Sequence, residues 1–320
     1  MTKPLRIGLL RLSDSAPVMI AHNAGLFAQY GLQTELVISP SWANIADGLV
    51  WNTLDAAIMF APLAMMTVLG RRGYASCLSP LTTLSRGGNT IILRGTNPFS
   101  GEWPKGIKGK EVFEHWRKTI GRRPKFSVVH MYSTHLLILR RFLLELGVDM
   151  EHDIEIQVMP PSDIIGALAD GSIDGGCVGP PWGAEACLRG LAFLAGGSGT
   201  VMPFHIEKQI VVSKSLIENT LHIRAIKLAL RDATTFLQTA HNQQGIAHEL
   251  AAPLNQHGLA LPEEATLETL TSEGFPERPQ YLCGLSDDRD IAWILDDMKE
   301  LNWIDHSEHS FLKNNWICRI

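Results

Sequence analysis

The sequence lacks the features that mark several classes of protein. Its 320 residues contain five cysteines, an odd number with no CxxC pair, which fits reduced thiols better than a disulfide framework. Its longest apolar run, residues 56–70, is too short to span a membrane and contains Pro62. There is no low-complexity segment or basic tail, and the net charge of −5 is too mild to predict direct binding of nucleic acid.

Motifs of the common enzyme classes are also absent. No GxSxG is present, HELAA at 248–252 departs from HExxH at its fifth residue, and GEWPKGIK at 101–108 lacks the lysine–hydroxyl pair of a phosphate-binding loop. At the N-terminus, MTKPLRIGLLRL has an apolar run that Arg11 interrupts, so we predict no secretory signal and expect a cytoplasmic protein.

What the sequence does contain is one pattern repeated about 119 residues later. Four anchors align: IGLLRLSDSA (7–16) with FSVVHMYSTH (126–135), TELVIS (34–39) with IEIQVMP (154–160), LDAA (54–57) with IDGG (173–176), and Pro62 with Pro181, with one small gap in the middle. In each copy the first strand is followed by an amphipathic helix that is predicted to stop at Gly31 or Gly147. The sequence therefore predicts two copies of a βαβαβ unit, and each copy is expected to form a parallel sheet with helices on both faces.

Each predicted unit carries a strand-to-helix turn at the carboxyl edge of its sheet, where open α/β folds bind ligands. These turns are SDS at 13–15 and YST at 132–134. Two helix N-termini that face each other across a cleft would form an anion site. Ser15 and Thr134 could instead be simple N-caps, and the small residues after Asp55 and Asp174 could serve sheet packing as well as close approach to a ligand.

Several segments carry a family resemblance when they are taken in order. They are SWANIADGL, LDAAIMFAP, FSVVHMYSTH, MPPSDIIGALADGSIDGGCVGPPWG and HIEKQIVVS. Together they resemble the nitrate-binding (NrtA/NasS-like) branch of the type II periplasmic-binding-protein superfamily, which includes nitrate and bicarbonate receptors of ABC transporters and cytoplasmic nitrate/nitrite sensors. The resemblance covers residues 5–215 well and continues weakly to IAWILDDMKELNWID at 291–305.

The resemblance implies a two-lobed α/β fold with the ligand in a cleft between the lobes. Each lobe would be a mainly parallel sheet flanked by helices. The first lobe would comprise residues 1–93 and 207–320, and the second lobe residues 94–206. Hinge crossovers are expected near 91–96 and 203–210.

The resemblance also implies a set of ligand-binding residues: Trp42, Asn89, Ser133, Thr134, Gly179 and Lys208. Further residues expected to line the cleft are Ser13, Asp14, Ser15, Pro180 and His205. Nitrate is planar and monovalent, so its site needs one positive charge, a few oriented donors and a dry wall. In this family Lys208 would supply the charge, Trp42 an indole N–H and Gly179 a backbone group.

Lys208 distinguishes two ligands within the resemblance. Bicarbonate-binding relatives carry an acidic residue at that position and use a metal, so Lys208 implies nitrate or nitrite, with no metal and no cofactor. Each residue also has a structural alternative: Trp42 could be a packing residue, Asn89 a turn residue after two glycines, and Lys208 a solvated lysine at a strand edge. Cys177 and Trp182 are expected to pack in the core.

The function implied by the resemblance is a cytoplasmic nitrate/nitrite sensor, not an enzyme. Such sensors hold an RNA-binding antiterminator of the response-regulator type (NasT-like) in an inactive complex and release it when the anion binds. Two alternatives stay open: a solute receptor of a nitrate ABC transporter, and a cytoplasmic enzyme of the menaquinone-pathway type on the same fold. His130, His135 and His205 could be metal ligands or bases, but we expect structural roles because no acidic or cysteine partner stands beside them at metal spacing.

Overall fold

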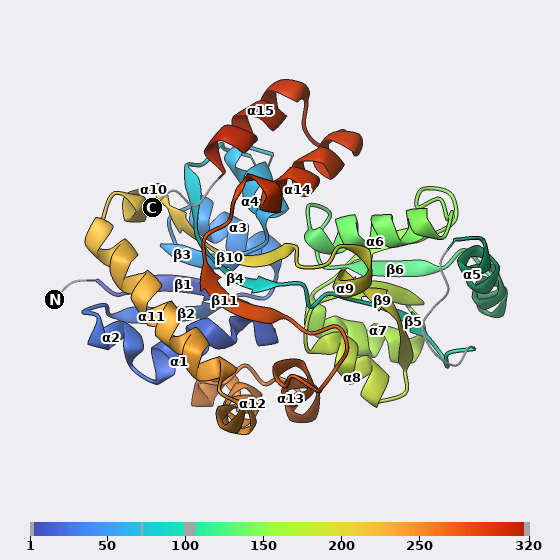
Figure 1. The fold of residues 1–320 in the computed structure, drawn as a ribbon, viewed down its shortest axis with the longest axis horizontal. Coiled ribbons are helices and arrows are strands. Elements are labelled where there is room, and N and C mark those ends of the chain that lie inside the picture. The colour runs from blue at the N-terminus through green and yellow to red at the C-terminus, as the bar shows by residue number, and fades with distance from the viewer. Residues whose placement is uncertain (1–2, 72, 99–105, 317–320) are drawn as a thin grey trace.

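The computed structural model describes residues 3–71, 73–98 and 106–316, and these residues form two lobes, each built on one sheet (Figure 1). The first sheet has the strand order β11-β4-β10-β3-β1-β2, with β1 Leu5–Leu9, β2 Thr34–Ile38, β3 Ala56–Met59, β4 Leu78–Arg86, β10 Ile206–Ser213 and β11 Gln280–Gly284. The second has the order β7-β6-β8-β5-β9, with β5 Thr90–Arg94, β6 Lys125–Val128, β7 Glu155–Val158, β8 Gly175–Val178 and β9 Ala192–Gly197. The predicted two-lobed α/β fold is confirmed. The expectation of mainly parallel sheets is wrong, because β10 pairs antiparallel with β3 and β4 in the first sheet and β5 pairs antiparallel with β8 and β9 in the second. Both sheets are mixed because the chain runs back through each of them after or before its parallel unit.

Helices cover both faces of each sheet (Figure 1). Around the first sheet lie α1 Ala16–Asn23, α2 Leu26–Gln29, α3 Trp42–Val50, α4 Ala61–Val68, α10 Lys214–Ile217, α11 Thr220–Gln238, α12 Gln243–Ala251, α13 Glu263–Leu270, α14 Asp288–Glu300 and α15 His306–Asn315. Around the second lie α5 Gly106–Ile120, α6 Thr134–Glu145, α7 Ile164–Asp170, α8 Trp182–Leu188 and α9 Ser198–Val201. Short 3-10 turns are η1 Ser13–Ser15, η2 Pro161–Asp163, η3 Ala240–Asn242 and η4 Leu254–Gln256.

The internal repeat is visible in the strand pairing. In the first sheet β1 pairs in parallel with β3 at Ile7↔Ala56 and with β2 at Ile7↔Leu36. In the second sheet β6 pairs in parallel with β8 at Phe126↔Gly175 and with β7 at Phe126↔Ile156. The pairing with the third strand recurs at an offset of 119 residues, and the pairing with the second strand is displaced by one more residue, which is the small gap in the alignment.

The first helix of the repeat is not the single helix that its periodicity predicts. It divides into α1 and α2 at Gly25, whose φ of 71° lies in the left-handed region that favours glycine. The equivalent helix α6 runs without a break from Thr134 to Glu145. The predicted stops at Gly31 and Gly147 both have positive φ, at 80° and 68°, as expected for residues just past a helix end.

The chain passes between the sheets at two short links. It leaves the first sheet after Arg86 and enters the second at Thr90, and it returns after α9 to begin β10 at Ile206. A third segment lies against these links, because Glu277 accepts a hydrogen bond of 2.7 Å from the backbone N–H of Gly199. The lobe boundaries at 93 and 207, and the hinge positions near 91–96 and 203–210, stay predictions.

The two lobes touch across the cleft through direct hydrogen bonds. The backbone N–H of Ser13 donates to the carbonyl of Pro180 at 3.0 Å, and Nε1 of Trp182 donates to the carbonyl of Arg11 at 2.9 Å. Below the sheets in Figure 1, α13 contacts α8, and above them α14 contacts α6. The structure is therefore a closed arrangement of the two lobes.

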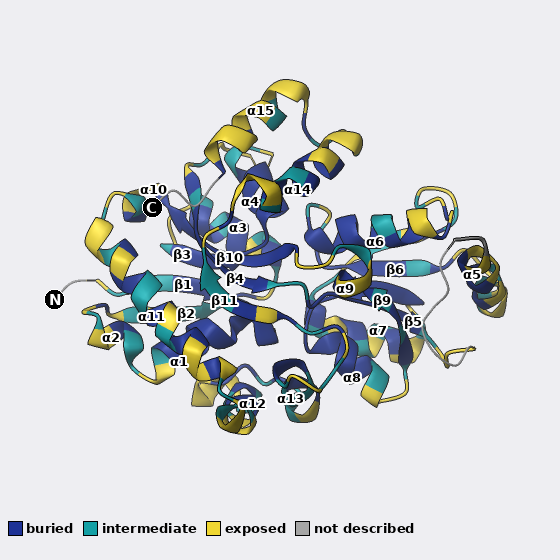
Figure 2. Cartoon of the chain, in the orientation of Figure 1, coloured by how far each residue is buried: buried dark blue, intermediate teal, exposed yellow. Residues whose placement is uncertain are grey.

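Burial follows the layers of the fold. The inner strands of both sheets and the inner helix faces are buried, the edge strands β2, β7 and β11 are partly exposed, and α5, α12 and α15 present exposed outer faces (Figure 2). Within the described part of the chain, no helix is both long enough and apolar enough to cross a membrane. The four described cysteines are free thiols, and Cys318 lies outside the described residues.

Candidate functional site

The predicted ligand-binding residues come from separate elements that meet where the lobes join. Trp42 is the first residue of α3, Thr134 is the first of α6, and Lys208 lies in β10. Asn89 lies in the link between β4 and β5. All four side chains are buried, with exposed fractions between 0% and 1%. Burial of four polar or amphipathic side chains at one place is unusual and points to a shared role.

Lys208 is the charged centre of this group. Its Nζ lies 2.5 Å from Oε1 of Glu207 and 3.4 Å from Oδ2 of Asp14. It also lies 5.5 Å from the ring centroid of Trp42 and 5.8 Å from that of Phe60, within the range of a cation–π contact. Lys208 is fully buried on β10, which pairs with a strand on each side, so it is not a solvated lysine at a sheet edge.

Glu207 is the residue that reasoning from the sequence missed. Its Oε1 accepts hydrogen bonds from Lys208 at 2.5 Å and from Oγ1 of Thr134 at 2.7 Å. Its Oε2 accepts from Nδ2 of Asn89 at 2.7 Å and lies 3.0 Å from Nε2 of His205. Three of the predicted anion-binding residues therefore converge on one buried carboxylate of the protein itself.

A β-bulge explains why this convergence was not predicted. Side chains alternate along a regular strand, so Glu207 and Lys208 should point to opposite faces of the sheet. In β10, however, Ile206 pairs with Arg86 and Lys208 pairs with Ser85, which leaves Glu207 without a partner across the ladder. The extra residue bends the strand and allows the Glu207 carboxylate to contact the Lys208 ammonium. The only sequence signal was the HIEK motif, in which Glu207 stands next to the predicted lysine.

Two histidines complete the group, which we call the Lys208 cluster; its members are Asp14, Trp42, Asn89, Thr134, His135, His205, Glu207 and Lys208. Nε2 of His135 lies 3.5 Å from Oε1 of Glu207, and its Nδ1 lies 3.2 Å from the carbonyl of Cys177. Glu207 thus faces both His135 and His205, a contact that was not predicted from the sequence. Even so, among the described residues no group of three or more His, Cys, Asp or Glu is placed to hold a metal ion.

Other predicted residues lie at the border of the cluster. A Cβ added to Gly179 would be 3.4 Å from Cε1 of His135, so Gly179 lies beside that ring. Ser133 caps α6, because its Oγ accepts a hydrogen bond of 3.1 Å from the backbone N–H of Leu136. Ser15 does not cap α1 and instead donates to the carbonyl of Leu10 at 2.8 Å. Ser13 and Pro180 meet each other through their backbones.

The small residues that follow Asp55 and Asp174 serve the sheets. A Cβ at Gly176 would come 2.3 Å from Oγ of Ser127 on the neighbouring strand, and one at Gly175 would come 2.8 Å from the carbonyl oxygen of Ile92. These positions are therefore restricted by packing between strands, which was the structural alternative considered for them.

Several polar atoms of the Lys208 cluster have no hydrogen-bond partner. They are Nε1 of Trp42, Oδ1 of Asn89, Oδ2 of Asp14 and Nε2 of His135, all of them buried. Oδ2 of Asp14 has only the long 3.4 Å contact to Lys208, while its Oδ1 accepts from Oγ of Ser85 at 2.8 Å. Nε2 of His135 likewise has only its 3.5 Å contact to Glu207. Buried polar groups are normally paired, so the partnerless Nε1 of Trp42 and Oδ1 of Asn89 indicate a place where a ligand or water completes the set.

Burial and the close charges shift the pKa values in opposite directions. Burial raises the pKa of Glu207, but Lys208 and the two histidines outweigh it and hold that pKa well below its ordinary value. Burial raises the pKa of the Asp14 carboxyl, and Lys208 offsets this only in part. Burial lowers the pKa of Lys208, but Asp14 and Glu207 outweigh it and raise the net value. Burial also lowers the pKa of His135. The cluster thus holds a charged Glu207–Lys208 pair in a dry environment.

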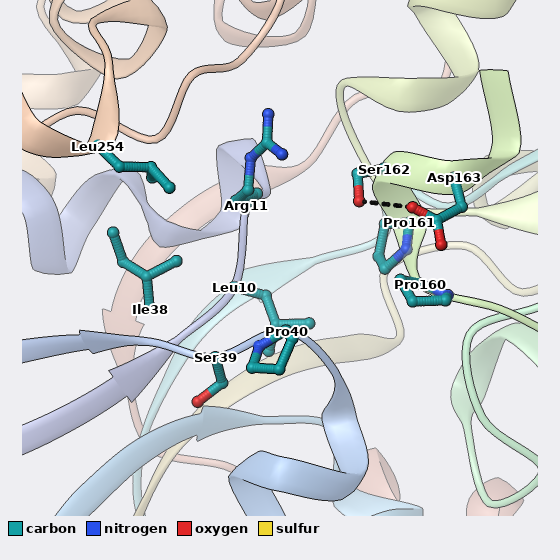
Figure 3. Close-up of a pocket in the computed structure, with 10 residues that line it drawn as sticks. All are labelled: Leu10, Arg11, Ile38, Ser39, Pro40, Pro160, Pro161, Ser162, Asp163 and Leu254. Carbon is teal, nitrogen blue, oxygen red and sulfur yellow. Dashed lines mark hydrogen bonds between the residues drawn. The ribbon is translucent and has the colours of Figure 1, made fainter. Parts of the chain in front are cut away.

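A solvent-accessible pocket of about 380 Å³ lies between the lobes (Figure 3). Residues 38–40 of the first lobe face residues 160–163 of the second across it. The wall of the first lobe also includes Leu10 and Arg11, which precede Asp14, and residues 38–40 precede Trp42. No member of the Lys208 cluster lines this pocket, so in this closed arrangement the cluster is separated from the open part of the cleft.

Comparison with known proteins was made on the whole chain. The model of the NMT1-like family matches residues 1–251. A protein named "Bicarbonate transport ATP-binding protein CmpC" from Synechococcus elongatus is 30% identical over 265 residues, which are 81% of this chain and 39% of the relative. "Nitrate/nitrite binding protein NrtA" from the same organism is 31% identical over 220 residues, 66% of this chain and 49% of the relative. The chain thus spans less than half the length of these relatives.

A search of solved structures supports the fold. The crystal structure of the periplasmic nitrate-binding protein NrtA from Synechocystis PCC 6803 superimposes with a TM-score of 0.81 at 19% identity, covering 97% of this chain and 85% of that one. These proteins are named for binding or transport of a solute and not for its chemical conversion. The expectation that the chain is not an enzyme agrees with these names, each of which belongs to a protein of which this chain covers only part.

Proposed function

We propose that this chain, which belongs to the NMT1-like family, binds a small planar oxyanion at the Lys208 cluster and that the ligand is nitrate or nitrite. The observation that carries the proposal is the convergence of donors from Asn89, Thr134 and Lys208 on one carboxylate. A carboxylate and a nitrate ion are both planar and monovalent and accept hydrogen bonds at their oxygens, so donors that suit the first suit the second.

The unpaired indole N–H of Trp42 adds a further donor to this set. It is buried, it makes no hydrogen bond to the protein, and its ring faces the ammonium of Lys208. The rings of Trp42 and Phe60, with centroids 4.4 Å apart, supply a dry wall. One cation, several donors and an apolar wall are what a weakly hydrogen-bonding monovalent anion requires.

The proposed biological role is that of a sensor in the cytoplasm. Its partner is an RNA-binding antiterminator of the response-regulator type, which binds the open form and is released when the anion closes the lobes. By linkage, anion and partner weaken each other's binding by the same factor. The role of this chain as a solute receptor of a nitrate transporter is the second candidate, favoured by the transport names of its relatives.

Calorimetry with nitrate, nitrite, bicarbonate, sulfate and chloride tests the ligand. We expect nitrate or nitrite to bind at one site per chain, and bicarbonate, with or without calcium, to bind much more weakly. Preferred binding of bicarbonate with calcium, or of sulfate, would contradict the proposal.

A pull-down from the native host, titrated with nitrate, tests the role. A protein partner that is retained without nitrate and released with it supports the sensor. Recovery of a partner whose retention does not respond to nitrate would contradict the sensor and favour the receptor.

A further inference from the structure

The carboxylate of Glu207 lies among the donors that the proposed anion needs. We propose that Glu207 is an internal competitor for the anion site, which gives up its donors to the ligand while a proton is taken up, so that anion binding is coupled to proton binding. This inference rests on the proposed function and adds to it a residue that sets affinity and pH dependence.

The competition follows from the number of donors. Thr134 has a single O–H group, which it donates to Oε1 of Glu207 at 2.7 Å. Nδ2 of Asn89 donates one N–H to Oε2 of Glu207 at 2.7 Å, and Nζ of Lys208 donates to Oε1 at 2.5 Å. A second anion cannot accept the same hydrogens, so ligand and carboxylate exclude each other at these contacts.

The geometry of His205 shows that a proton is already held beside Glu207. Nδ1 of His205 lies 2.9 Å from the carbonyl of Met202, which can only accept, so Nδ1 carries a hydrogen. Nε2 lies 3.0 Å from Oε2 of Glu207, and that hydrogen bond needs a second proton, either on the ring or on the carboxyl group. This hydrogen bond therefore places a proton within reach of Oε2 of Glu207.

The charges around this pair make the proton requirement stronger when an anion binds. Asp14 from η1, His135 from α6 and Lys208 from β10 face it, and Glu277 lies close to His205 on the side of the 271–279 segment. Lys208 is the single lysine or arginine among these groups. A bound anion adds a negative charge and draws Lys208 away from Glu207, and both effects favour protonation of the Glu207 carboxylate.

The sign of the effect is fixed by linkage. If the complex holds one more proton than the free protein, the affinity for the anion falls as the pH rises, by up to about tenfold per pH unit. Burial raises the pKa of Glu207, and Lys208 is the first of the groups that hold it low in the free protein, so the transfer of Lys208 to a ligand shifts that pKa upward.

The test counts protons and removes the competitor. Nitrate binding is measured by calorimetry between pH 6 and 9 in two buffers with different heats of ionisation, for the native protein, for Glu207→Gln and for Glu185→Gln. Glu185 is a buried carboxylate of α8 that pairs with Arg189 at 2.5 Å and serves as the matched control. We expect proton uptake and falling affinity with pH in the native protein and in Glu185→Gln. We expect tighter binding, without proton uptake, in Glu207→Gln.

Each outcome decides between the possibilities. Nitrate binding by the native protein without proton uptake, at an affinity independent of pH, would overturn the inference even if Glu207→Gln fails to fold. Binding by Glu207→Gln that is no tighter than native and keeps its pH dependence would also overturn it. If neither the native protein nor Glu207→Gln binds nitrate or nitrite, the proposed function fails and this inference fails with it.

Discussion

Arg141 and Asp297 form a two-bond salt bridge between α6 of the second lobe and α14, which packs against α4 of the first. Nε of Arg141 lies 2.7 Å from Oδ2 of Asp297, and Nη2 lies 2.9 Å from Oδ1. Asp297 is only 2% exposed, and Arg140 adds a bond of 2.9 Å to Glu300 nearby. These residues are 156 positions apart in the chain, so the bridge joins two distant segments, α6 and α14, in this arrangement of the lobes.

Replacement of Asp297 by Asn is expected to weaken anion binding by favouring the open form. Charge-assisted hydrogen bonds contribute about 1.5–3 kcal/mol, so the apparent affinity for nitrate should fall by about ten- to a hundredfold. Calorimetry gives the affinity, and small-angle scattering gives the size of the free protein, which should increase. The control is Glu114→Gln, which removes an ion pair within α5 and should change neither quantity. Native affinity in Asp297→Asn would show that the bridge does not control closure.

Lys208→Met should abolish anion binding and also destabilise the protein. A ligand-binding Lys208 on an otherwise independent strand could be removed at little cost to stability, but the buried cluster changes that result. Removal of one member of a buried ion pair costs about 3–5 kcal/mol because Glu207 is left charged without a partner. The melting temperature should therefore fall at pH 7, while the exposed-site control Lys118→Met should retain the native value.

The loss of stability in Lys208→Met should depend on pH in a defined direction. In the native protein the pKa of Glu207 is lowered, so its contribution is present above the unfolded value near 4.5 and is lost as the pH falls below it. Without Lys208 the folded-state pKa of the carboxyl rises, and the folded state then binds protons more tightly. The gap in melting temperature between native and variant should therefore narrow from pH 7 to pH 5. A constant gap would contradict this account.

Trp42→Phe should separate the indole N–H from the aromatic wall. Nε1 of Trp42 makes no bond to the protein, so its removal leaves no broken bond in the free protein. Loss of one hydrogen bond to the anion, about 1–1.5 kcal/mol, should weaken nitrate binding about tenfold. The control is Trp116→Phe, because Nε1 of Trp116 donates to the carbonyl of Arg94 at 3.2 Å and not to the cluster. In this variant the stability should fall while the nitrate affinity stays native. Equal nitrate affinity in Trp42→Phe would remove Trp42 from the site.

Asp14→Asn should stabilise the protein at neutral pH and strengthen anion binding. The folded-state pKa of Asp14 is raised above 3.8, mainly by burial, so its contribution to stability is present below 3.8 and lost as the pH rises through the folded value. Asparagine keeps an acceptor for Ser85 and removes the cost of the buried charge. Melting curves should show a gain at pH 7 that shrinks toward pH 4. Asp174→Asn, which breaks ion pairs to Arg94 and Arg122, should instead lose stability at pH 7.

The sequence by itself determined the repeated architecture. The alternation of short strands and amphipathic helices, and the anchors near an offset of 119 residues, predicted the parallel unit in each sheet, and the strand pairing reproduces that offset. The antiparallel strands β10 and β5, which make both sheets mixed, were not predicted. Periodicity is a local property, so it can be read without coordinates. The helix break at Gly25 was missed because a left-handed residue inside an otherwise regular pattern leaves little trace in hydrophobicity.

The resemblance selected Trp42, Asn89, Thr134 and Lys208, and the structure places all four in one cluster. Their role in binding an anion stays a prediction. Only the tertiary structure revealed that Glu207 joins them, because a bulge in β10 overturns the alternation that would place it on the other face of the sheet. Only the tertiary structure paired Arg141 with Asp297 across the lobes. Both features depend on how distant segments meet, and contacts of that kind are decided by packing between lobes and not by any pattern along the chain.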